Sequence, residues 1–534
     1  MRHMSGRVRL ILSVVVMVSV MIMATASAQT LSVGQQQKRW LDPQAPDGMS
    51  TPTYSPPAPH DPRHQMPNMK MLAGSSAAVA AAAPETGGQW AYLPPFPKGF
   101  NAPHMVVGRG GKVLLVAGSG LSASKFAAGT FQTYLWDPAT GLQKKIPTPV
   151  DLFCGGHVLM PDGRALIVGG TTSYNPWKGG KFAYAFNFVT EAYEKLPSMA
   201  KGRWYPSVVT LADGRQVIAA GFDETGAPTK VNEIYDPKAN TMSMLPGQRQ
   251  FPLYPRMHLA SNGKIFNAVS NQGFWSPLTN AFQAVGGTAS TKTNAVATCF
   301  IGDVRDQNLM TLGGGWPGTN ATRIVNLAQA TPTYRAGPPL LASKGYLGCV
   351  NMPDMTLFEA NGGSDNTIAA ASTEAGMLAD VKSSWTPMTP LPTGEHRLYH
   401  SMLALLDDGR VLSMTSNPKN GAPWSTSVLA YSPPYMFKGQ RPTTTLAPTL
   451  VTYGGTYSVA ATAATGSTVN RVVITTAPAP THGMDNGQRS LSLTIVNGKV
   501  TMPTEPTIMP PGMYRMWSVD TVGRPSVARW FEMR

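Results

Sequence analysis

Short apolar segments alternate with glycine-rich turns along residues 95–440, and one such unit recurs seven times. Each copy has a turn containing Asp-Gly-Arg or a relative of it, then an apolar segment of strand length, then Gly-Gly or a similar pair. The turns lie at Gly110, Asp162, Asp213, Asn262, Asp306, Asp354 and Asp408, a spacing near 50 residues. A period of about 50 residues is typical of kelch blades, each a four-stranded antiparallel sheet arranged around a channel. The pattern therefore predicts a seven-bladed kelch-type β-propeller over residues 91–441.

Beyond Pro442 the repeat stops and short alternating segments follow. They cover residues 447–453, 455–460, 469–476, 490–495, 513–519 and 527–532. Short strands at this spacing predict an immunoglobulin-like (early-set) β-sandwich over residues 442–534. The expected fold class is therefore all-β, a propeller followed by a sandwich.

The N-terminal segment has the pattern of an export signal. Three arginines precede an apolar run over residues 10–24, and Ala26-Ser27-Ala28 forms a small-residue cleavage site. We predict a signal peptide over residues 1–28 and a secreted or cell-envelope protein. A retained membrane anchor is the alternative, although Ser and Thr interrupt the run and it is barely long enough to span a bilayer. Residues 29–90 are rich in Pro and Ala without apolar periodicity, which predicts a disordered linker.

Composition agrees with a protein of strands and turns and narrows the range of partners. Only 13% of the residues are charged, while Gly (53) and Pro (47) are abundant. The net charge is +15, but the chain has no dense Lys/Arg run and no nucleic-acid-binding motif. We therefore expect a diffuse basic surface and no nucleic-acid partner. Association with cell-wall or other anionic polysaccharide fits this charge, and we expect a monomer.

Reactive side chains recur at one position of the repeat. Cys154 precedes Gly163 by nine residues, and Tyr205 and His400 precede the glycines of their own turns by the same nine. Equivalent positions in different blades lie on one face of a propeller, so these side chains should meet at one rim. Tyr254 has the same offset and is a fourth candidate, whose role stays open. A lone Tyr or Cys in an inner strand is usually a packing residue, but a shared register argues against packing alone.

Two further residues extend this group. Tyr399 precedes His400, and His482 lies in a Gly/Asn-rich loop between two predicted strands of the sandwich. His482 would join the rim if its loop entered the propeller channel from one face. Two phenols, two imidazoles and a thiol suit a redox metal that favours imidazole, and copper fits best. Cys299 and Cys349 could form one disulfide or both be free, which leaves Cys154 for another covalent fate.

The local sequences around these residues resemble those of the copper radical oxidases, the galactose oxidase and glyoxal oxidase family. They are Phe-Cys-Gly at 153–155, Arg-Trp-Tyr-Pro at 203–206, Arg-Leu-Tyr-His at 397–400 and Thr-His at 481–482, in the family order. The resemblance implies one copper ion held by Tyr205, Tyr399 (axial), His400 and His482. It also implies a thioether between Cys154 and Tyr205, formed after translation, that carries a radical. Cys154, Tyr205 and Tyr399 would then be the catalytic residues.

The same resemblance implies an exported oxidase of small aldehydes or simple primary alcohols, with dioxygen reduced to hydrogen peroxide. Two departures favour the glyoxal oxidase-like branch over galactose oxidase. Asp223 stands where galactose oxidase has a Trp over the thioether, and the N-terminal carbohydrate-binding domain is replaced by the Pro/Ala-rich segment. Whether Trp204 shields the radical instead is open. The alternatives are a secreted kelch propeller that binds glycans or proteins with a vestigial metal site, and a metal-binding protein without turnover.

Overall fold

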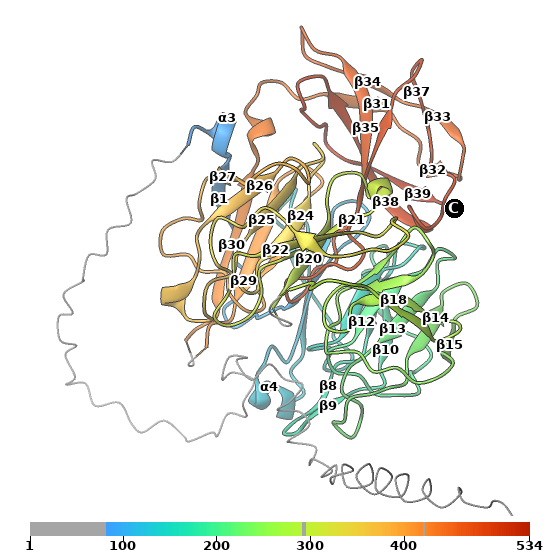
Figure 1. Cartoon of the computed structure of the whole chain (residues 1–534). Coiled ribbons are helices and arrows are strands. Elements are labelled where there is room, and N and C mark those ends of the chain that lie inside the picture. Colours follow the sequence, from blue (N-terminus) through green and yellow to red (C-terminus); the bar gives the residue numbers. More distant parts are fainter. Residues whose placement is uncertain (1–81, 291–294, 420–421) are drawn as a thin grey trace, which may run out of the picture.

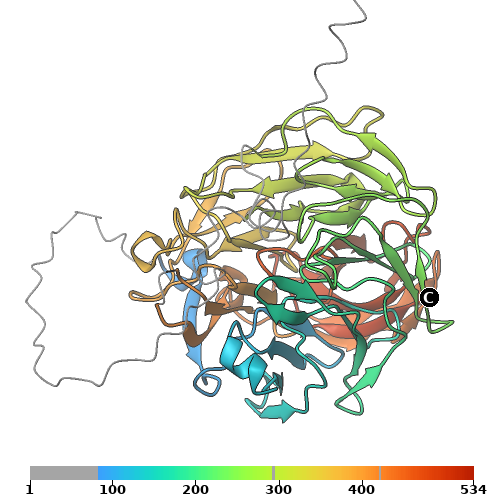
Figure 2. The ribbon, with the colours of Figure 1, turned by 90° about the horizontal axis from the view of Figure 1, so that it is seen from below.

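The computed structural model describes residues 82–290, 295–419 and 422–534, which form a propeller and a smaller C-terminal domain (Figure 1). Within these residues, seven four-stranded antiparallel sheets follow one another around a ring. Figure 2 shows this order as colours that run around the ring from blue through green and yellow to orange. The predicted seven-bladed propeller and all-β fold are confirmed. The predicted signal peptide (1–28) and most of the predicted linker lie outside the described residues.

Each blade is given from the channel outward. Blade 1 is β2 (His104–Val107), β3 (Val113–Gly118), β4 (Gln132–Trp136) and β5 (Gln143–Ile146); blade 2 is β6 (Gly156–Leu159), β7 (Ala165–Val168), β10 (Ala183–Asn187) and β11 (Ala192–Lys195); blade 3 is β12 (Ser207–Thr210), β13 (Gln216–Ala219), β14 (Glu233–Asp236) and β15 (Thr241–Met244). Blade 4 is β16 (Met257–Leu259), β17 (Ile265–Asn267), β18 (Gly273–Ser276) and β19 (Ala281–Ala284); blade 5 is β20 (Ala297–Phe300), β21 (Asn308–Leu312), β22 (Thr322–Asn326) and β23 (Arg335–Ala336). Blade 6 is β24 (Gly348–Asn351), β25 (Leu357–Ala360), β26 (Ala375–Leu378) and β27 (Thr386–Met388); blade 7 is β28 (Met402–Leu405), β29 (Val411–Ser416), β30 (Ser425–Ser432) and β1 (Gln89–Leu93). Blade 2 also carries a hairpin inserted between β7 and β10, formed by β8 (Thr171–Tyr174) and β9 (Trp177–Gly179). The described residues also contain five short helical segments: α3 (Pro84–Gly87), α4 (Ala123–Ala127), and the 3-10 turns Val304–Asp306, Ile368–Ala370 and Pro434–Met436.

The repeated Asp-Gly-Arg turn has a simple local cause. In blade 2 the Asp162 carboxylate accepts a hydrogen bond from the backbone N–H of Arg164 at 3.0 Å. Gly163 between them has φ 82°, a left-handed conformation that only glycine adopts at little cost. The turn closes an inner hairpin whose second strand, β7, is wholly buried, while the outermost strand β11 is largely exposed. Burial thus decreases from the channel outward, which explains why the apolar run follows the turn.

Blade 7 is completed by the N-terminal strand. β1 pairs antiparallel with β30, with Trp90 opposite Tyr431. This pairing joins the two ends of the propeller, so the ring needs no other closure. It also corrects the expected linker over 29–90, because α3 and the first two residues of β1 fall inside that range. Within the described residues, strand structure begins before residue 91, since Gln89 and Trp90 pair across the ring with β30.

The C-terminal domain is the expected sandwich. Its strands are β31 (Thr443–Leu446), β32 (Leu450–Val451), β33 (Thr456–Ser458), β34 (Ala460–Thr462), β35 (Val469–Thr476), β36 (Ser490–Thr494), β37 (Lys499–Thr501), β38 (Gly512–Asp520) and β39 (Arg529–Met533). The main sheet has the order β32-β39-β38-β35-β36. The domain packs on the propeller at the Asp-Gly turns: Arg515 donates to the carbonyl of Leu405 at 2.7 Å, and Arg441 donates to that of Asp408 at 2.7 Å. Among the described residues, no helix has the length and apolar character needed to cross a membrane.

One loop of the sandwich, residues 477–489 between β35 and β36, runs through the propeller channel; we call it the channel loop. The carbonyls of Pro478 and Pro480 accept hydrogen bonds from the backbone N–H groups of Val107 and Met105 in β2, so the loop runs along the inner strand of blade 1. It returns along the inner strands of other blades, where Asn486 accepts from the backbone N–H of Met257 at 3.2 Å. The loop therefore reaches from the Asp-Gly end of the channel to the opposite rim, as the sequence predicted for His482.

A disulfide joins Cys299 of β20 to Cys349 of β24, which settles the pairing that the sequence left open. It links the inner strands of blades 5 and 6. Gln488 of the channel loop donates to the carbonyl of Cys349 at 3.0 Å and accepts from the backbone N–H of Asn351 at 2.5 Å. The returning limb of the channel loop is thus held against blade 6, and Met484 of the loop forms a β-bridge with Thr298 of blade 5.

Candidate metal centre

Six inner strands begin with the same unusual backbone turn at the rim. A residue two or three positions before each strand has a positive φ: Cys154 (61°), Tyr205 (66°), Tyr254 (44°), Ala295 (56°), Tyr346 (56°) and His400 (65°). Left-handed conformations are uncommon for residues other than glycine and cost of order 1 kcal/mol or more each. Their repetition at one position of the fold shows that the blade architecture imposes them. It also puts the predicted rim residues at one end of the channel.

Backbone hydrogen bonds tie successive rim residues together. The N–H of Tyr205 donates to the carbonyl of Cys154 at 2.9 Å, and the N–H of Tyr254 donates to that of Tyr205 at 2.9 Å. Blade 3 approaches closely at Gly156, two residues after Cys154, where a Cβ would lie 2.8 Å from the carbonyl of Pro206. The Phe-Cys-Gly-Gly sequence is therefore a packing requirement of the rim as well as a motif.

The four predicted metal ligands meet at this rim. The hydroxyls of Tyr205 and Tyr399 are hydrogen-bonded to each other, and Nε2 of His482 lies 3.2 Å from the Tyr205 hydroxyl. The ring centroid of His400 is 3.8 Å from that of Tyr399 and 4.6 Å from that of His482. All four side chains are buried. Two blades and the sandwich thus contribute one compact group of two phenols and two imidazoles.

Cys154 completes this group. Its thiol is buried and outside any disulfide, and its sulfur and ring nitrogens of His400 and His482 all lie within 4.8 Å of one another. Burial raises the pKa of the Cys154 thiol, while its hydrogen bond with Tyr205 acts in the opposite direction. The contact with Tyr205 puts the sulfur beside the phenol with which the sequence motifs would link it.

Burial sets the protonation states of the four ligand groups. Burial raises the pKa of both the Tyr205 and Tyr399 phenols well above the ordinary value and lowers the pKa of the His400 and His482 imidazoles. Without a cation the phenols therefore stay protonated and the imidazoles neutral. Neutral imidazoles are ready ligands, and a bound divalent ion would reverse the penalty on the phenolates. The two imidazoles are therefore hard to protonate but have ligand atoms available for a metal ion.

The hydrogen bonds of the two imidazoles test whether a metal fits. His482 uses Nδ1 for the hydroxyl of Thr481 at 2.6 Å, which turns Nε2 toward the site. Such a second hydrogen bond is the usual way in which proteins orient a metal-binding imidazole. His400 is fully buried, yet neither of its ring nitrogens has a hydrogen-bond partner among the described residues. Buried polar atoms without partners are rare and costly. A metal ion at this place would satisfy His400, so the residues present fit the group.

Aromatic rings cover the phenol of Tyr205. The ring of Trp204 is stacked on it at 3.8 Å between centroids and 4° between planes, and Tyr254 stacks on it at 4.3 Å. Trp204 therefore takes the place over the phenol that the sequence left undecided. Asp223 instead uses its carboxylate in a turn of its own, accepting from the N–H of Thr225 at 2.8 Å.

Other contacts of the site were missed or left unassigned by sequence reasoning. Tyr346 lies 4.7 Å from Tyr399 between ring centroids, and its place two residues before β24 is the repeat signal that could have found it. His104 accepts from the backbone N–H of Cys154 at 3.0 Å through Nε2, and its Nδ1 lies 3.1 Å from the Thr481 hydroxyl. His104 thus joins the Cys154 turn to the channel loop, a role that no local motif announces.

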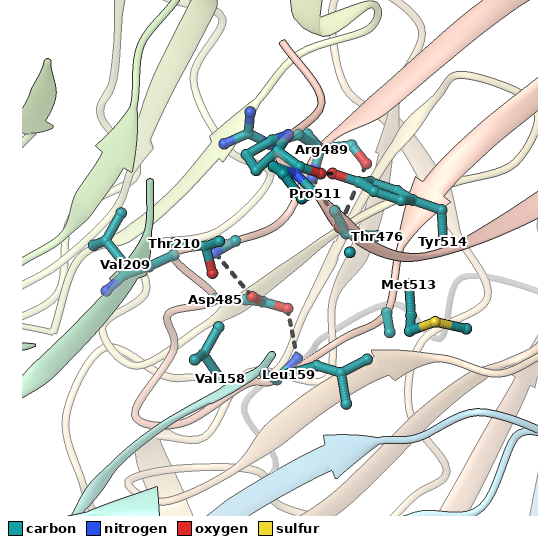
Figure 3. Close-up of a pocket in the computed structure, with 16 residues that line it drawn as sticks. Val158, Leu159, Val209, Thr210, Thr476, Asp485, Arg489, Pro511, Met513 and Tyr514 are labelled. Carbon is teal, nitrogen blue, oxygen red and sulfur yellow. Dashed lines mark hydrogen bonds between the residues drawn. The ribbon is translucent and has the colours of Figure 1, made fainter. Parts of the chain in front are cut away.

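A separate cavity of about 60 Å³ lies between blades 2 and 3 and the sandwich (Figure 3). Asp485 of the channel loop, Arg489 and Tyr514 line it, and burial raises the pKa of Asp485 to about 6. The volume suits one or two water molecules rather than an organic substrate. The cavity faces the Asp-Gly end of the channel and does not contain the ligand atoms described above.

Comparisons with known proteins agree with this fold. Residues 441–533 match the galactose oxidase-like early set domain family. The chain is 26% identical over 467 residues to a WSC domain-containing protein of Arthroderma benhamiae, covering 79% of this chain and 50% of that protein. It is 26% identical to an aldehyde oxidase of Vitis pseudoreticulata (72% and 82% covered) and 23% identical to a galactose oxidase of Gibberella zeae (74% and 63% covered). The chain therefore spans about half the length of the first of these relatives.

A solved structure of a fungal alcohol oxidase of the AA5 family, in complex with copper, has the same fold. The TM-score is 0.73 at 22% sequence identity, and the match covers 84% of this chain and 100% of the other. The coverage spans propeller and sandwich together, so the relative arrangement of the two domains is shared.

Proposed function

We infer that this chain is a copper radical oxidase, a relative of the galactose oxidases and aldehyde oxidases. The resemblance that the sequence motifs indicated is confirmed at this level. We further propose that the protein oxidises small aldehydes or simple primary alcohols by two electrons and reduces dioxygen to hydrogen peroxide. The observation that carries the proposal is the convergence of Cys154, two phenols and two imidazoles on one buried point.

Tyr205, Tyr399, His400 and His482 would hold one copper ion. When bound, copper supplies Lewis acidity toward a substrate oxygen and the capacity to hold one electron. Oxidising an alcohol removes two electrons, so the protein must supply a place for the second. A phenol linked to sulfur through a carbon ortho to its hydroxyl is easier to oxidise than a plain phenol, and Tyr205 beside Cys154 is the group that can become one.

The two tyrosines take different parts of the substrate. We assign the proton of the substrate hydroxyl to Oη of Tyr399, and the hydrogen atom of the adjacent carbon to Oη of the oxidised Tyr205. The substrate then leaves as the aldehyde, having lost two electrons and two protons. Dioxygen takes up the same two electrons and two protons and leaves as hydrogen peroxide. An aldehyde substrate enters the same balance as its hydrate, which carries the required hydroxyl.

The surroundings of the two phenols suit this chemistry. Trp204 and Tyr254 stack on Tyr205, and Tyr346 packs against Tyr399, so water has little access to either ring. Without a bound cation neither buried phenol would lose its proton, as the raised pKa values indicate, and bound copper would stabilise Tyr399 as the phenolate that accepts the substrate proton. Excluding water protects a phenol radical from side reactions. The site is thus arranged to pass protons and electrons from the substrate to dioxygen.

Peptide mass mapping tests the proposal at its covalent step. The mature protein is loaded with copper in air, reduced, alkylated and digested. We expect the peptides of Cys154 and Tyr205 to remain joined after reduction, lighter than their sum by two hydrogens. Protein kept in chelator and the Cys154→Ser variant are the controls, and both should give separate peptides.

Hydrogen peroxide release with a panel of small aldehydes and primary alcohols then ranks the substrates. Separate peptides after copper loading, with Cys154 free to alkylate, would remove the two-electron mechanism. In that case a glycan- or protein-binding propeller with a vestigial metal site would explain the fold better.

We also propose that the protein is exported after cleavage behind Ala28. The support is the charged, apolar and small-residue pattern of residues 1–28. N-terminal sequencing of the protein from the culture medium should begin at Gln29, whereas an intact N-terminus in the membrane fraction would identify a retained anchor.

A further inference from the structure

Blade 1 differs from the other six blades at the rim. Among the described residues, none of the three positions before β2 has the positive φ that precedes the other inner strands. Ala102 stands nine residues before Gly111, where other blades place their reactive side chains. The channel loop pairs with blade 1 instead, through an isolated β-bridge between His104 and Thr481. Blade 1 therefore contributes to the metal centre indirectly, through the two side chains of this bridge.

The hydroxyl of Thr481 lies among three polar atoms. They are the carbonyl oxygen of Pro103 at 2.8 Å, Nδ1 of His104 at 3.1 Å and Nδ1 of His482 at 2.6 Å. A hydroxyl has one hydrogen to donate and two lone pairs, whereas a carbonyl can only accept. If the hydroxyl donates to Pro103, both imidazoles must donate to its oxygen. Its three neighbours then fill its whole hydrogen-bonding capacity.

The backbone of Cys154 decides which nitrogen of His104 carries the proton. Nε2 of His104 accepts from the N–H of Cys154 at 3.0 Å. Burial lowers the pKa of His104 well below its ordinary value, so the ring is neutral and has a single proton. Because Nε2 is the acceptor, this proton is on Nδ1, which faces Thr481. His104 therefore donates to the Thr481 hydroxyl oxygen.

The same hydroxyl selects the tautomer of His482. With its hydrogen engaged by Pro103, Thr481 accepts from Nδ1–H of His482. The lone pair of His482 is then on Nε2, the nitrogen that lies 3.2 Å from the Tyr205 hydroxyl. An imidazole binds a metal through such a lone pair, and the hydrogen bond of its other nitrogen orients the ring. The opposite tautomer would take the Thr481 hydrogen away from the Pro103 carbonyl.

His104 also holds the backbone of Cys154. The N–H of Cys154 donates to His104, and its carbonyl accepts from the N–H of Tyr205 at 2.9 Å. Between these two bonds the backbone has φ 61°, a conformation that is uncommon for residues other than glycine. Loss of either bond would free the turn to relax. The position of the Cys154 sulfur against the Tyr205 ring therefore depends on His104.

We propose that Thr481 and His104 are positioning residues that prepare the metal centre before copper enters. Thr481 presents the unprotonated Nε2 of His482, and His104 holds the Cys154 turn where its sulfur can react with Tyr205. The proposal rests on the oxidase function above. It adds that copper binding and cross-link formation depend on one hydrogen-bonded chain, which runs from the Cys154 N–H through His104 and Thr481 to His482.

The bond that His104 prepares joins Sγ of Cys154 to the ring carbon of Tyr205 ortho to its hydroxyl. The S–H bond and one ring C–H bond break as the S–C bond forms. Dioxygen takes up the two electrons and two protons and leaves as hydrogen peroxide. His104 neither gains nor loses a proton in this step. Another side chain that accepts from the Cys154 N–H at the same place should therefore replace it.

Copper affinity tests the role of Thr481. Cupric ion is titrated against a competing chelator in the Cys154→Ser background, where no thioether can form. We expect Thr481→Val to weaken binding by about tenfold or more, the usual effect of losing the partner of a metal-binding imidazole, and Thr481→Ser to bind as the parent does. The nitrogen splitting in the electron paramagnetic resonance spectrum should indicate two imidazoles with Ser and one with Val. Thr298→Val, which removes a hydroxyl 2.9 Å from Nε2 of His258, is the matched control and should keep full affinity.

The rate of cross-link formation tests the role of His104. Protein with Cys154 intact is mixed with saturating copper in air, and the fraction of joined Cys154 and Tyr205 peptides is followed by mass mapping. His104→Asn keeps a donor near the place of Nδ1 but loses the acceptor, and should slow the reaction by about tenfold or more. His104→Gln carries an oxygen near the place of Nε2 and should restore the rate. His258→Asn is the control for loss of a buried imidazole and should react at the wild-type rate.

Each measurement has its own refuting result. Equal copper affinity in Thr481→Val and Thr481→Ser would overturn the role of Thr481, and equal cross-linking rates in His104→Asn and His104→Gln would overturn that of His104. If the wild type itself binds no copper or forms no cross-link, the oxidase assignment fails instead. Unfolding curves identify variants that do not fold. Thr481→Ala and His104→Leu then replace Thr481→Val and His104→Asn, since they remove the same groups.

Discussion

Replacing His400 with Phe should stabilise the folded protein in the absence of copper. The same change should remove most of the stabilisation that bound copper provides to the wild type. His400 is fully buried and both of its ring nitrogens lack hydrogen-bond partners among the described residues. Each buried polar atom left unpaired costs about 1–3 kcal/mol. Phe keeps a planar ring against Tyr399 and Trp424 but removes both nitrogens. The slightly larger ring costs about 1–3 kcal/mol in packing. We expect a net gain of about 1–3 kcal/mol in chelator, since removing two unpaired atoms outweighs the added bulk.

Copper reverses the order. A ligand at about 100 times its Kd stabilises the folded state by about 2.7 kcal/mol, and the wild type should gain this amount. The His400→Phe variant should gain little, because it has lost one of four ligands. Thermal or denaturant unfolding, in chelator and in copper, measures both the stability without copper and the stabilisation that copper adds. His258→Phe is the matched control: His258 is equally buried and hydrogen bonds Thr298 through Nε2 at 2.9 Å, so the variant should lose stability and keep the full copper effect.

Either of two results would refute this reasoning. If His400→Phe were less stable than wild type in chelator by more than about 1 kcal/mol, unpaired nitrogens would not be a cost at this site. If copper stabilised the variant as much as wild type, His400 would not be a metal ligand.

Two further predictions concern stability away from the ligands. The Cys299–Cys349 disulfide closes a loop with a sequence separation of 50, and the chain-entropy relation gives about 4 kcal/mol for a loop of that size. Changing both cysteines to Ala should lower the unfolding free energy by about that amount in equilibrium denaturation, and a loss under about 1 kcal/mol would show that the channel loop alone holds blades 5 and 6. Asp485 has its pKa raised by burial from 3.8 to about 6, so the folded state holds its proton more tightly than the unfolded state. The contribution of Asp485 to the free energy of unfolding is therefore fully present below about pH 4 and is lost, by about 3 kcal/mol, as the pH rises through 6. Asp485→Asn should remove this slope from the wild-type curve, and two parallel pH profiles would contradict the assignment.

The blades and the residues that meet at the rim could be predicted from the sequence because their signals are local. The Asp-Gly-Arg turn needs only its own carboxylate, its own N–H and one glycine, as at Asp162 and Gly163. The nine-residue offset from that turn marked Cys154, Tyr205 and Tyr254 without any knowledge of the fold. All three have left-handed backbones at the rim, so one repeated conformation underlies the offset.

Other features depended on contacts between segments far apart in the sequence. Gln89 and Trp90 read as the end of a linker, because a two-residue pattern has no recognisable period, yet they complete blade 7 by pairing with β30. The disulfide between Cys299 and Cys349 could not be assigned, since only the closeness of β20 and β24 brings the two sulfurs together.

The contacts around the phenol of Tyr205 also depended on segments far apart in the sequence. Tyr205 and its neighbour Trp204 were visible as a motif, but their near-parallel stacking follows from the strained turn before β12. The approach of Trp177 from an inserted hairpin, and of His482 from another domain, follows from packing alone. The sequence by itself determined which residue types recur at the rim, because period and turn chemistry are local. Only the tertiary structure decided which rings touch Tyr205 and that the nitrogens of His400 find no hydrogen-bond partner in the described part of the chain, because those facts are set by distances between blades.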